Sequence, residues 1–346
     1  MQEDILGLPF PVLQDKLAAL QLPAYRAGQV FTWLHGKRVH SFAEMTNLSN
    51  NDRRLLTEQY CMPTLFAEQA LRSDRDDTRK YLFRLADRET IESVVMQYKC
   101  GSSICISTQV GCKMHCAFCA SGMHGFKRNL TAGEIVGQVY EAQRDFGQPI
   151  TRLVLMGVGE PLDNYANVRD ALHILTHPDG QNLGRRRISL STSGIVPGIE
   201  TLAHDFPQLT LSVSLHAPND ALRSEMMPVN RTYPLLAVLE ACRKWSARTR
   251  RRITFEYALF DNVNDSDGTA RELAALLKGM FAHVNLITGN EVEELGYRRS
   301  TPDRIRAFHQ ILADSGLTVT LRRTLGRDIS GACGQLRSNR ENLPRK

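Results

Sequence analysis

The first sixty residues carry short helical patterns of apolar positions. The runs 13–20 and 27–34 place apolar residues three or four positions apart, as on one face of a helix. No strand-like alternation lies between the two runs. The pattern predicts a small helical accessory domain over residues 1–75.

Two runs with a different period follow the helical segment. Residues 80–85 and 90–96 alternate apolar and polar positions and are rich in β-branched and aromatic side chains. The polar segment 86–89 between them is typical of a turn. We therefore expect a β-hairpin that links the accessory domain to a larger domain over residues 76–346.

After Cys105 the pattern becomes strand, loop and helix, repeated. The helix that opens at Thr131 begins with a capping box to Glu134, followed by apolar positions on one face. Repeated βα units form a parallel sheet, so we expect an α/β fold with an open sheet or a barrel. The predicted strands are 104–109, 152–156, 187–190, 209–213, 253–259, 284–287 and 317–321.

Composition places the chain among ordinary globular proteins. Its 346 residues are 42% hydrophobic and 23% charged, which excludes a disordered, collagen-like or coiled-coil chain. No run approaches the roughly 18 apolar residues of a membrane span, and the chain starts with acidic residues where a signal peptide would be basic. We expect a soluble cytoplasmic protein with no membrane partner and about two domains.

Basic residues exceed acidic ones, with 43 Lys and Arg against 37 Asp and Glu and a formal net charge of +6. The excess lies beyond residue 60 and would suit a partner that carries phosphate groups. Each basic cluster alone also fits ordinary solvated surface charge. The clusters are Arg185–Arg187, Arg248 with Arg250–Arg252, Arg298–Arg299, Arg322–Arg323 and Arg345–Lys346.

Four of the eight cysteines, Cys105, Cys112, Cys116 and Cys119, fall within fifteen residues. In a reducing compartment such a group indicates metal or redox chemistry rather than a disulfide framework. The last three form a C-x3-C-x2-C run, whose thiolates can bind three irons of a [4Fe-4S] cluster and leave the fourth iron open to a substrate. The alternative is a structural zinc site, with His115 or Cys105 as fourth ligand, in a non-catalytic RNA-binding protein.

The cysteine run, with Phe118 before its last cysteine, resembles the motif of the radical S-adenosylmethionine (SAM) superfamily, whose open iron binds the methionine part of SAM. Polar residues and glycines also follow several predicted strands, where a parallel barrel places its site. A turn glycine or a helix N-cap would explain each alone, but together they indicate a single site. They are Gly157–Pro161, Ser191, Ser214–His216 and Asn290.

Along essentially its whole length the chain is similar to the RlmN/Cfr family of radical SAM RNA adenosine methyltransferases. The resemblance implies a partial (βα)6 radical SAM barrel with an N-terminal RNA-binding domain, and nothing in the sequence demands more than a monomer. The residues that carry it are Cys105, Cys333 within 331–336, Ile91–Val94, Ser107–Gly111, Arg128–Leu130 and Val263–Asp265.

The resemblance also implies a route that uses two SAM molecules in turn. Cys333, as a thiolate, would take a methyl group from the first and become S-methylcysteine. A radical made from the second would abstract hydrogen from that methyl group, and the resulting methylene radical would join the adenine ring. Cys105 would release the product through a transient disulfide with Cys333, with Glu92 as proton acceptor and a flavodoxin-type reductant to reset the pair.

Carbon C2 of adenine is electron-poor, so ordinary polar transfer from SAM cannot methylate it and a radical is needed. We expect C2 methylation in the peptidyl transferase region of large-subunit ribosomal RNA, and some relatives also modify the transfer RNA adenosine 3′ of the anticodon. The alternative is C8 methylation, the Cfr activity. The resemblance assigns the [4Fe-4S] cluster to Cys112, Cys116 and Cys119, and SAM contacts to Gly159, Glu160, Ser191, Ser214, Leu215, His216 and Asn290.

Overall fold

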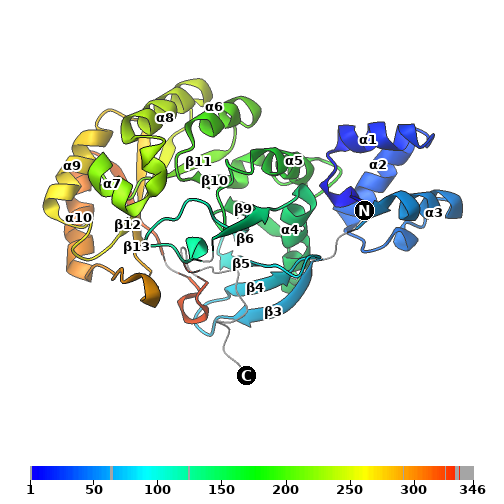
Figure 1. The fold of residues 1–346 in the computed structure, drawn as a ribbon, viewed down its shortest axis with the longest axis horizontal. Coiled ribbons are helices and arrows are strands. Elements are labelled where there is room, and N and C mark those ends of the chain that lie inside the picture. The colour runs from blue at the N-terminus through cyan, green and yellow to red at the C-terminus, as the bar shows by residue number, and fades with distance from the viewer. Residues whose placement is uncertain are drawn as a thin grey trace.

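The computed structural model describes residues 2–62, 65–123, 125–290, 292–323, 325–331 and 335. Cys333 and the basic pair Arg345–Lys346 lie outside the described residues. In Figure 1 a group of helices at the N-terminus lies beside a larger body, in which helices line the outside of a curved sheet. Of the helices within the described ranges, none combines the length and the apolarity that crossing a membrane requires.

The N-terminal part is helical, as predicted, and two short strands close it. Strand β1 (Glu3–Asp4) pairs in parallel with β2 (Tyr60–Cys61), so the two ends of this part meet. Strands of two residues are too short to show an alternating pattern, which is why the sequence did not predict them. The helices are α1 (Phe10–Ala19), α2 (Tyr25–Phe31) and α3 (Asn50–Gln59).

The N-terminal part packs on α4 (Ala132–Phe146), the first long helix of the larger body. The backbones approach closely there, since a Cβ on Gly7 would lie 3.0 Å from the backbone nitrogen of Gly133. Across the same contact, His35 Nδ1 lies 3.0 Å from the Tyr140 hydroxyl, and burial lowers the pKa of His35 to about 3. A neutral hydrogen bond within buried apolar surface therefore fixes the accessory part to the larger body.

Ten strands form a single mixed sheet within the described residues, in the order β14-β13-β12-β11-β10-β9-β6-β5-β4-β3. Strands β6 and β9 to β14 are parallel to one another, whereas β5, β4 and β3 continue the sheet in antiparallel pairs. The predicted α/β fold is thus confirmed. The bounds are β3 (Phe66–Arg72), β4 (Arg79–Arg84), β5 (Thr90–Tyr98), β6 (Gly101–Cys105), β9 (Ile150–Leu155), β10 (Ile188–Thr192), β11 (Thr210–Ser214), β12 (Ile253–Leu259), β13 (Ala282–Thr288) and β14 (Thr318–Leu321).

The predicted linking hairpin is formed by β4 and β5, and β3 extends it to three strands. Strand β3 lies inside residues 1–75, the range predicted for the accessory domain, yet it pairs along its length with β4. Its sequence contains no β-branched residue, and most of its side chains are exposed. Both features weaken the strand pattern that a sequence can show.

Alternation along the parallel strands separates a helix-covered face from an inner face (Figure 1). In β11, Leu211 and Val213 are fully buried in the main core, whereas Ser214 lines a cavity on the other face. Polar side chains are thereby directed to the inside of the curved sheet. The further helices are α5 (Tyr165–Thr176), α6 (Val196–Asp205), α7 (Asp220–Met226), α8 (Leu235–Thr249), α9 (Asp267–Leu277) and α10 (Pro302–Asp314).

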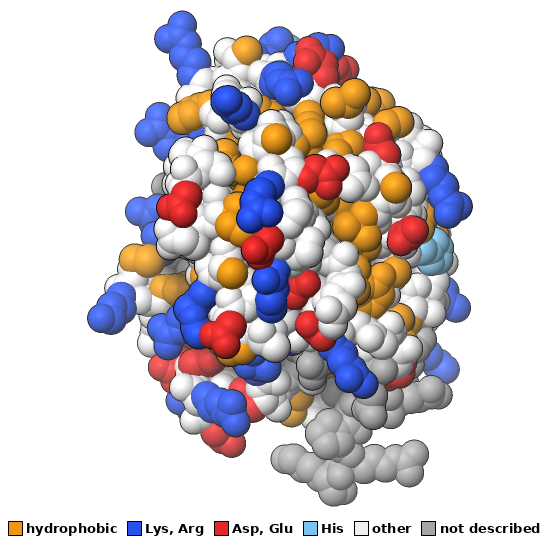
Figure 2. Space-filling model, turned by 90° about the vertical axis from the view of Figure 1, so that its left-hand side faces the viewer, with side chains coloured by type: hydrophobic (Ala, Val, Ile, Leu, Met, Phe, Trp, Pro, Cys, Tyr) orange, Lys and Arg blue, Asp and Glu red, His pale blue; other side chains and the backbone are white. Residues whose placement is uncertain are grey.

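The basic clusters fall at both ends of the parallel strands. Arg185–Arg187 and Arg250–Arg252 directly precede β10 and β12, whereas Arg298–Arg299 and Arg322–Arg323 lie at the carboxyl ends, where the site is predicted. Figure 2 shows the side of the molecule that carries α9 and α10, where basic and acidic side chains are interspersed. That side fits solvated surface charge rather than a phosphate-binding surface.

Candidate active site

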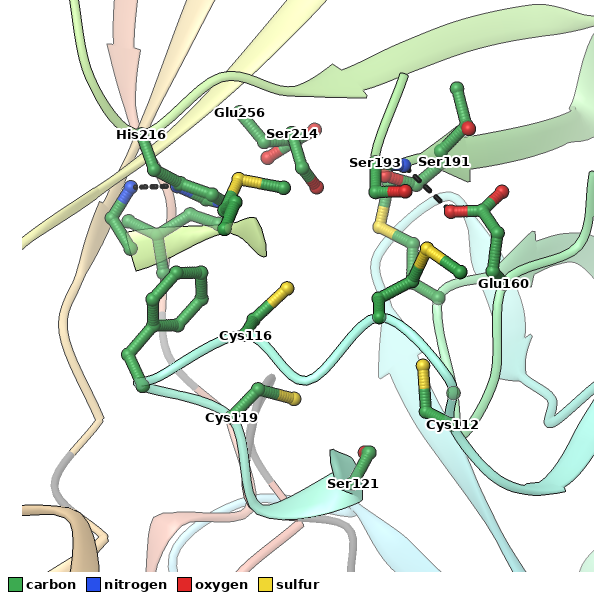
Figure 3. Close-up of a pocket in the computed structure, with 18 of the residues that line it drawn as sticks. Cys112, Cys116, Cys119, Ser121, Glu160, Ser191, Ser193, Ser214, His216 and Glu256 are labelled. Carbon is green, nitrogen blue, oxygen red and sulfur yellow. Dashed lines mark hydrogen bonds between the residues drawn. The ribbon is translucent and has the colours of Figure 1, made fainter. Parts of the chain in front are cut away.

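A cavity of about 150 Å³ opens at the carboxyl ends of the parallel strands (Figure 3). Leu215 lies in the hydrophobic core, and Cys105 and Glu92 lie outside the cavity lining. Most of the residues predicted for the cluster and for SAM do meet in the cavity. They are Cys112, Cys116, Cys119, Gly159, Glu160, Ser191, Ser214, His216 and Asn290.

The cysteine loop starts from a tight pair of strands, β7 (Gln109–Gly111) and β8 (Phe126–Asn129). Gly111 has φ +73°, and a Cβ there would overlap the carbonyl oxygen of Gly125, so the position requires glycine. Inside the loop, the amide of Ala117 donates to the carbonyl of Met226 at 2.9 Å. The loop is thus anchored both at its start and at its middle.

The three thiols of the loop face the same space inside the cavity (Figure 3). Burial raises the pKa of Cys112 to about 12 and raises the pKa of Cys119. Burial and the two neighbouring thiols raise the pKa of Cys116. Thiols in such surroundings become thiolates when a bound metal supplies the compensating positive charge. The cavity therefore fits an iron cluster held by these three residues.

The arrangement fits an iron–sulfur cluster better than a single zinc ion. No three His, Cys, Asp or Glu side chains in the described part of the chain lie where they could share one metal ion. A [4Fe-4S] cluster needs no such convergence, because each thiolate binds a different iron. His115, considered as a fourth zinc ligand, is exposed outside the cavity lining, and Cys105 packs in a separate apolar cluster.

Glu160 joins two of the loops that line the cavity. Its carboxylate accepts hydrogen bonds from the backbone amides of Leu162, at 3.0 Å, and Ser193, at 2.7 Å. Burial raises the pKa of Glu160, and these hydrogen bonds oppose that rise. Gly159 has φ +105°, and a Cβ there would lie 2.6 Å from the Cβ of Gln109. The glycine is required for the turn, and Glu160 is a fixed acceptor at the wall of the cavity.

Hydrogen-bond donors also line the cavity. The Ser193 hydroxyl is buried there and has no hydrogen-bond partner among the described residues. The amide of Ala258 donates to His216 Nδ1 at 2.9 Å, and burial lowers the pKa of His216 to about 3. The neutral ring therefore carries its proton on Nε2. Together with Glu160, these groups match the amino, carboxylate and hydroxyl groups of SAM.

Arg223 on α7 is a fully buried arginine that sequence reasoning missed. Its guanidinium donates to the carbonyls of Ser193, at 2.7 Å, and Ser214, at 3.1 Å. It also donates to the Leu215 carbonyl, at 3.2 Å, and to Asn230 Oδ1, at 2.8 Å. Burial lowers the pKa of Arg223 to about 10, so it stays charged at neutral pH. Arg223 thus joins the ends of β10 and β11, which line the cavity.

Replacing Arg223 with Met should destabilise the protein by about 3 kcal/mol or more, because several buried carbonyl oxygens lose their donor. SAM affinity should fall as well, since the ends of β10 and β11 are no longer held together. Urea denaturation at matched iron content measures the first effect. Arg243→Met on the surface of α8, where Arg243 lies 3.7 Å from Glu240, is the control and should change stability by less than about 0.5 kcal/mol. A similarly small change for Arg223→Met would contradict the proposed role.

Glu256 is a second cavity residue that the sequence interpretation missed. It is a buried carboxylate on β12 that lines the cavity beside Ser214, its partner in register (Figure 3). The side-chain amide of Asn285 donates to Glu256 at 2.8 Å. Burial raises its pKa, and the charge of Arg322 opposes that rise. The available signal was a lone acid within the apolar run of β12.

A second group of polar residues lies on one face of the hairpin, next to the cavity. Cys105 and Lys80 are both register partners of Val94, and Glu92 is two residues before Val94, so these side chains share a face. Lys80 Nζ lies 2.6 Å from Glu92 Oε1, and both side chains are buried. Met156 lines the cavity and also packs on the apolar cluster that contains Cys105. The cavity and the hairpin face therefore border one another.

Two family models match this chain. The Radical SAM superfamily matches residues 106–274, and a family described as the ribosomal RNA large subunit methyltransferase N-terminal domain matches residues 3–62. Over 337 residues the chain is 46% identical to a probable dual-specificity RNA methyltransferase RlmN of Clostridium novyi, covering 97% of this chain and 98% of that protein. The chain belongs to the RlmN family of radical SAM methyltransferases.

Other RlmN-family comparisons agree. A probable dual-specificity RNA methyltransferase RlmN of Symbiobacterium thermophilum is 47% identical over 340 residues, covering 97% of this chain and 92% of that protein. The crystal structure of a radical SAM methyltransferase from Sphaerobacter thermophilus matches with a TM-score of 0.93 and 44% identity, covering 97% and 100% of the two chains. The predicted family is thus confirmed, and this RlmN-family protein is a methyltransferase enzyme. The N-terminal match, 3–62, contains both strands that close the accessory part.

Proposed function

We propose that this RlmN-family enzyme transfers a methyl group to carbon C2 of adenosine in RNA. Its substrates would be the peptidyl transferase region of large-subunit ribosomal RNA and the transfer RNA adenosine 3′ of the anticodon, in keeping with the dual specificity in the names of its relatives. The observation that carries the proposal is the contact, through Met156, between the three-thiol cavity and the Glu92–Cys105 face. The cavity proposed for the cofactors and the groups proposed for a second chemical step would therefore be neighbours.

The cavity would hold both cofactors. When bound, the [4Fe-4S] cluster and SAM supply the methyl group and the one-electron chemistry that carbon C2 requires, with two SAM molecules used per product. Glu160 would accept a hydrogen bond from the SAM amino group, and serine hydroxyls would donate to its carboxylate. Leu215 would contribute its backbone alone, because its side chain lies in the core. The cluster ligands would be Cys112, Cys116 and Cys119, and the SAM contacts Gly159, Glu160, Ser191, Ser214, Leu215, His216 and Asn290, all of which except Leu215 line the cavity.

Three side chains would carry the transfer itself. The Cys333 thiolate would accept a methyl group from SAM by displacement and then hold it for the RNA. Once that carbon is bonded to the adenine ring, the radical adduct would give up one electron, which the cluster can take up when bound, and Glu92 would accept the proton that leaves C2. Cys105, which forms no disulfide within the described residues, would then attack the Cys333 sulfur. A sulfur–sulfur bond forms, the carbon–sulfur bond breaks, and its electron pair takes up a proton to complete the methyl group.

The remaining partners follow from this chemistry. The disulfide left on the protein needs two electrons, which a flavodoxin-type reductant would supply. The target base must leave its stack to reach the cavity, so the protein needs RNA-binding surfaces on both sides of the cavity. Arg298–Arg299 and Arg322–Arg323 at the cavity end, together with the accessory domain over 1–75, would provide them. We expect the core domain over 76–346 to act with it as a cytoplasmic monomer.

Nucleoside mass spectrometry tests the proposed function. Anaerobically reconstituted enzyme, with about four irons per chain, is given SAM, reductant and either unmodified ribosomal RNA or transfer RNA, and digests are compared with 2-methyladenosine and 8-methyladenosine standards. We expect 2-methyladenosine from both RNAs, and none when the reductant is omitted. Detection of 8-methyladenosine instead would show that the enzyme methylates C8, the Cfr activity, and not C2. Bound zinc with no methylated product would indicate a non-catalytic RNA-binding protein.

A further inference from the structure

The chain returns to the hairpin face just before Cys333. Residues 325–331, here called the arm, end two positions before Cys333 along the chain. Leu325 at the start of the arm is buried in the apolar cluster that contains Cys105. Cys105 shares its face of the hairpin with Glu92. The arm therefore begins against the face that carries the proposed resolving and proton-accepting groups.

The turn between β3 and β4 holds the arm through several hydrogen bonds. The Asp328 carboxylate accepts from the Ser73 hydroxyl, at 2.8 Å, and from the Asp74 amide, at 3.0 Å. The Gly326 amide donates to the Asp76 carboxylate at 3.2 Å. Gly326 has φ +63°, which suits glycine at this point of the turn. These contacts connect residues about 250 positions apart and fix the arm in one place.

Lys80 connects the other end of the arm to Glu92. Its ammonium lies 2.6 Å from Glu92 Oε1 and donates to the carbonyl of Ser330 at 3.2 Å. The side chains of Lys80 and Glu92 are only 7% and 2% exposed. A buried ion pair gives little net stability compared with apolar packing. The pair is therefore better explained by what it positions than by the stability it adds.

We propose that Lys80 and the turn at residues 73–78 form a clamp, which holds the arm, the described segment that leads to Cys333, against the face where Glu92 lies. Lys80 would be a positioning residue that aligns the Glu92 carboxylate and the arm at the same time. This inference rests on the proposed function, because it takes Cys333 and Glu92 as the reacting groups. The clamp itself is a structural claim that can be measured without catalysis.

Two variants weaken the clamp at different points. Lys80→Met keeps a long apolar stem but removes the charge that joins Glu92 to Ser330. Asp328→Ala removes the exposed carboxylate that accepts from Ser73 and Asp74, and leaves the Lys80–Glu92 pair intact, so it keeps the test valid if Lys80→Met does not fold. Lys278→Met, an exposed lysine after α9, is the matched control. All are made in the full chain with reconstituted cluster.

Hydrogen exchange is the readout that does not depend on activity. The amides of Gly326 and Gly331 are hydrogen-bonded within the clamp and the arm. In both clamp variants we expect them to exchange about tenfold faster or more, as for the loss of a hydrogen bond to a charged group. Iron content and SAM affinity should stay within twofold of the wild type. Unchanged exchange in Asp328→Ala and Lys80→Met would overturn the clamp.

Methyl transfer is the second readout. RNA methylation should fall about 100-fold in Lys80→Met, as for a misplaced reacting group, and less in Asp328→Ala, while Lys278→Met keeps wild-type activity. Full methylation in both clamp variants would overturn the positioning role. If the wild type itself forms neither S-methylcysteine nor methylated RNA, the proposed function fails, and the exchange data still decide whether the clamp exists.

Discussion

Cys116→Ala should abolish cluster binding and reduce RNA methylation to background. Cys116 is the middle thiol of the loop, and burial, together with its two neighbouring thiols, raises its pKa. Losing it leaves two thiolates for a cluster that three would hold, and neither Cys105 nor His115 lines the cavity to replace it. Iron should fall from about four per chain to well below one. Iron and sulfide analysis, followed by nucleoside mass spectrometry, measures both effects.

Cys242→Ala is the matched control for this experiment. Cys242 is a fully buried cysteine on α8, in the main core and away from the cavity lining. Its replacement leaves a small void that should cost about 1 kcal/mol of stability, with iron content and methylation retained. Full iron content in Cys116→Ala would show that this loop does not bind the cluster. Equal loss of iron in both variants would point to a general folding defect instead.

Most of the parallel strands could be predicted because they are buried, largely apolar runs between helical patterns, although β14 is mostly exposed. The predicted 253–259 coincides with β12. The predicted 104–109 does not hold as a single strand, since β6 ends at Cys105 and Gln109 already belongs to β7. Residues 106–108 leave the sheet but stay buried, with backbone hydrogen bonds to the loop after β9. Burial alone does not tell a sheet strand from a covered connection.

Site residues were predictable where the side chain type and the strand end coincided. Ser191, Ser214 and Glu160 follow this rule, and all three line the cavity. Arg223 and Lys80 do not follow it, because their roles depend on partners from distant elements. Lys80 occupies an ordinary polar position of a hairpin strand, and only the register of β4 with β5 and the return of the arm show it buried beside Glu92.

Cys105→Ala should stop turnover and accumulate protein covalently joined to RNA. Cys105 is the group proposed to break the bond between Cys333 and the methylated base, so without its sulfur the adduct has no route to release. Alanine fits the site, which is apolar and formed by Val94, Met96 and Leu325, and the lost sulfur should cost about 1 kcal/mol. Denaturing gels detect the adduct, and peptide mass spectrometry locates the nucleotide on Cys333.

The control for the trapped adduct is Cys100→Ala. Cys100 is exposed at the turn between β5 and β6, five residues from Cys105, with its sulfur 3.0 Å from Arg152 Nη1. It should turn over like the wild type and trap nothing, because it lies away from the hairpin face. Product release by Cys105→Ala at the wild-type rate would show that Cys105 is not the group that releases the product. If the inactive variant carries S-methylcysteine but no RNA, Cys105 would be needed to form the bond between the methyl carbon and the base, rather than to release the product afterwards.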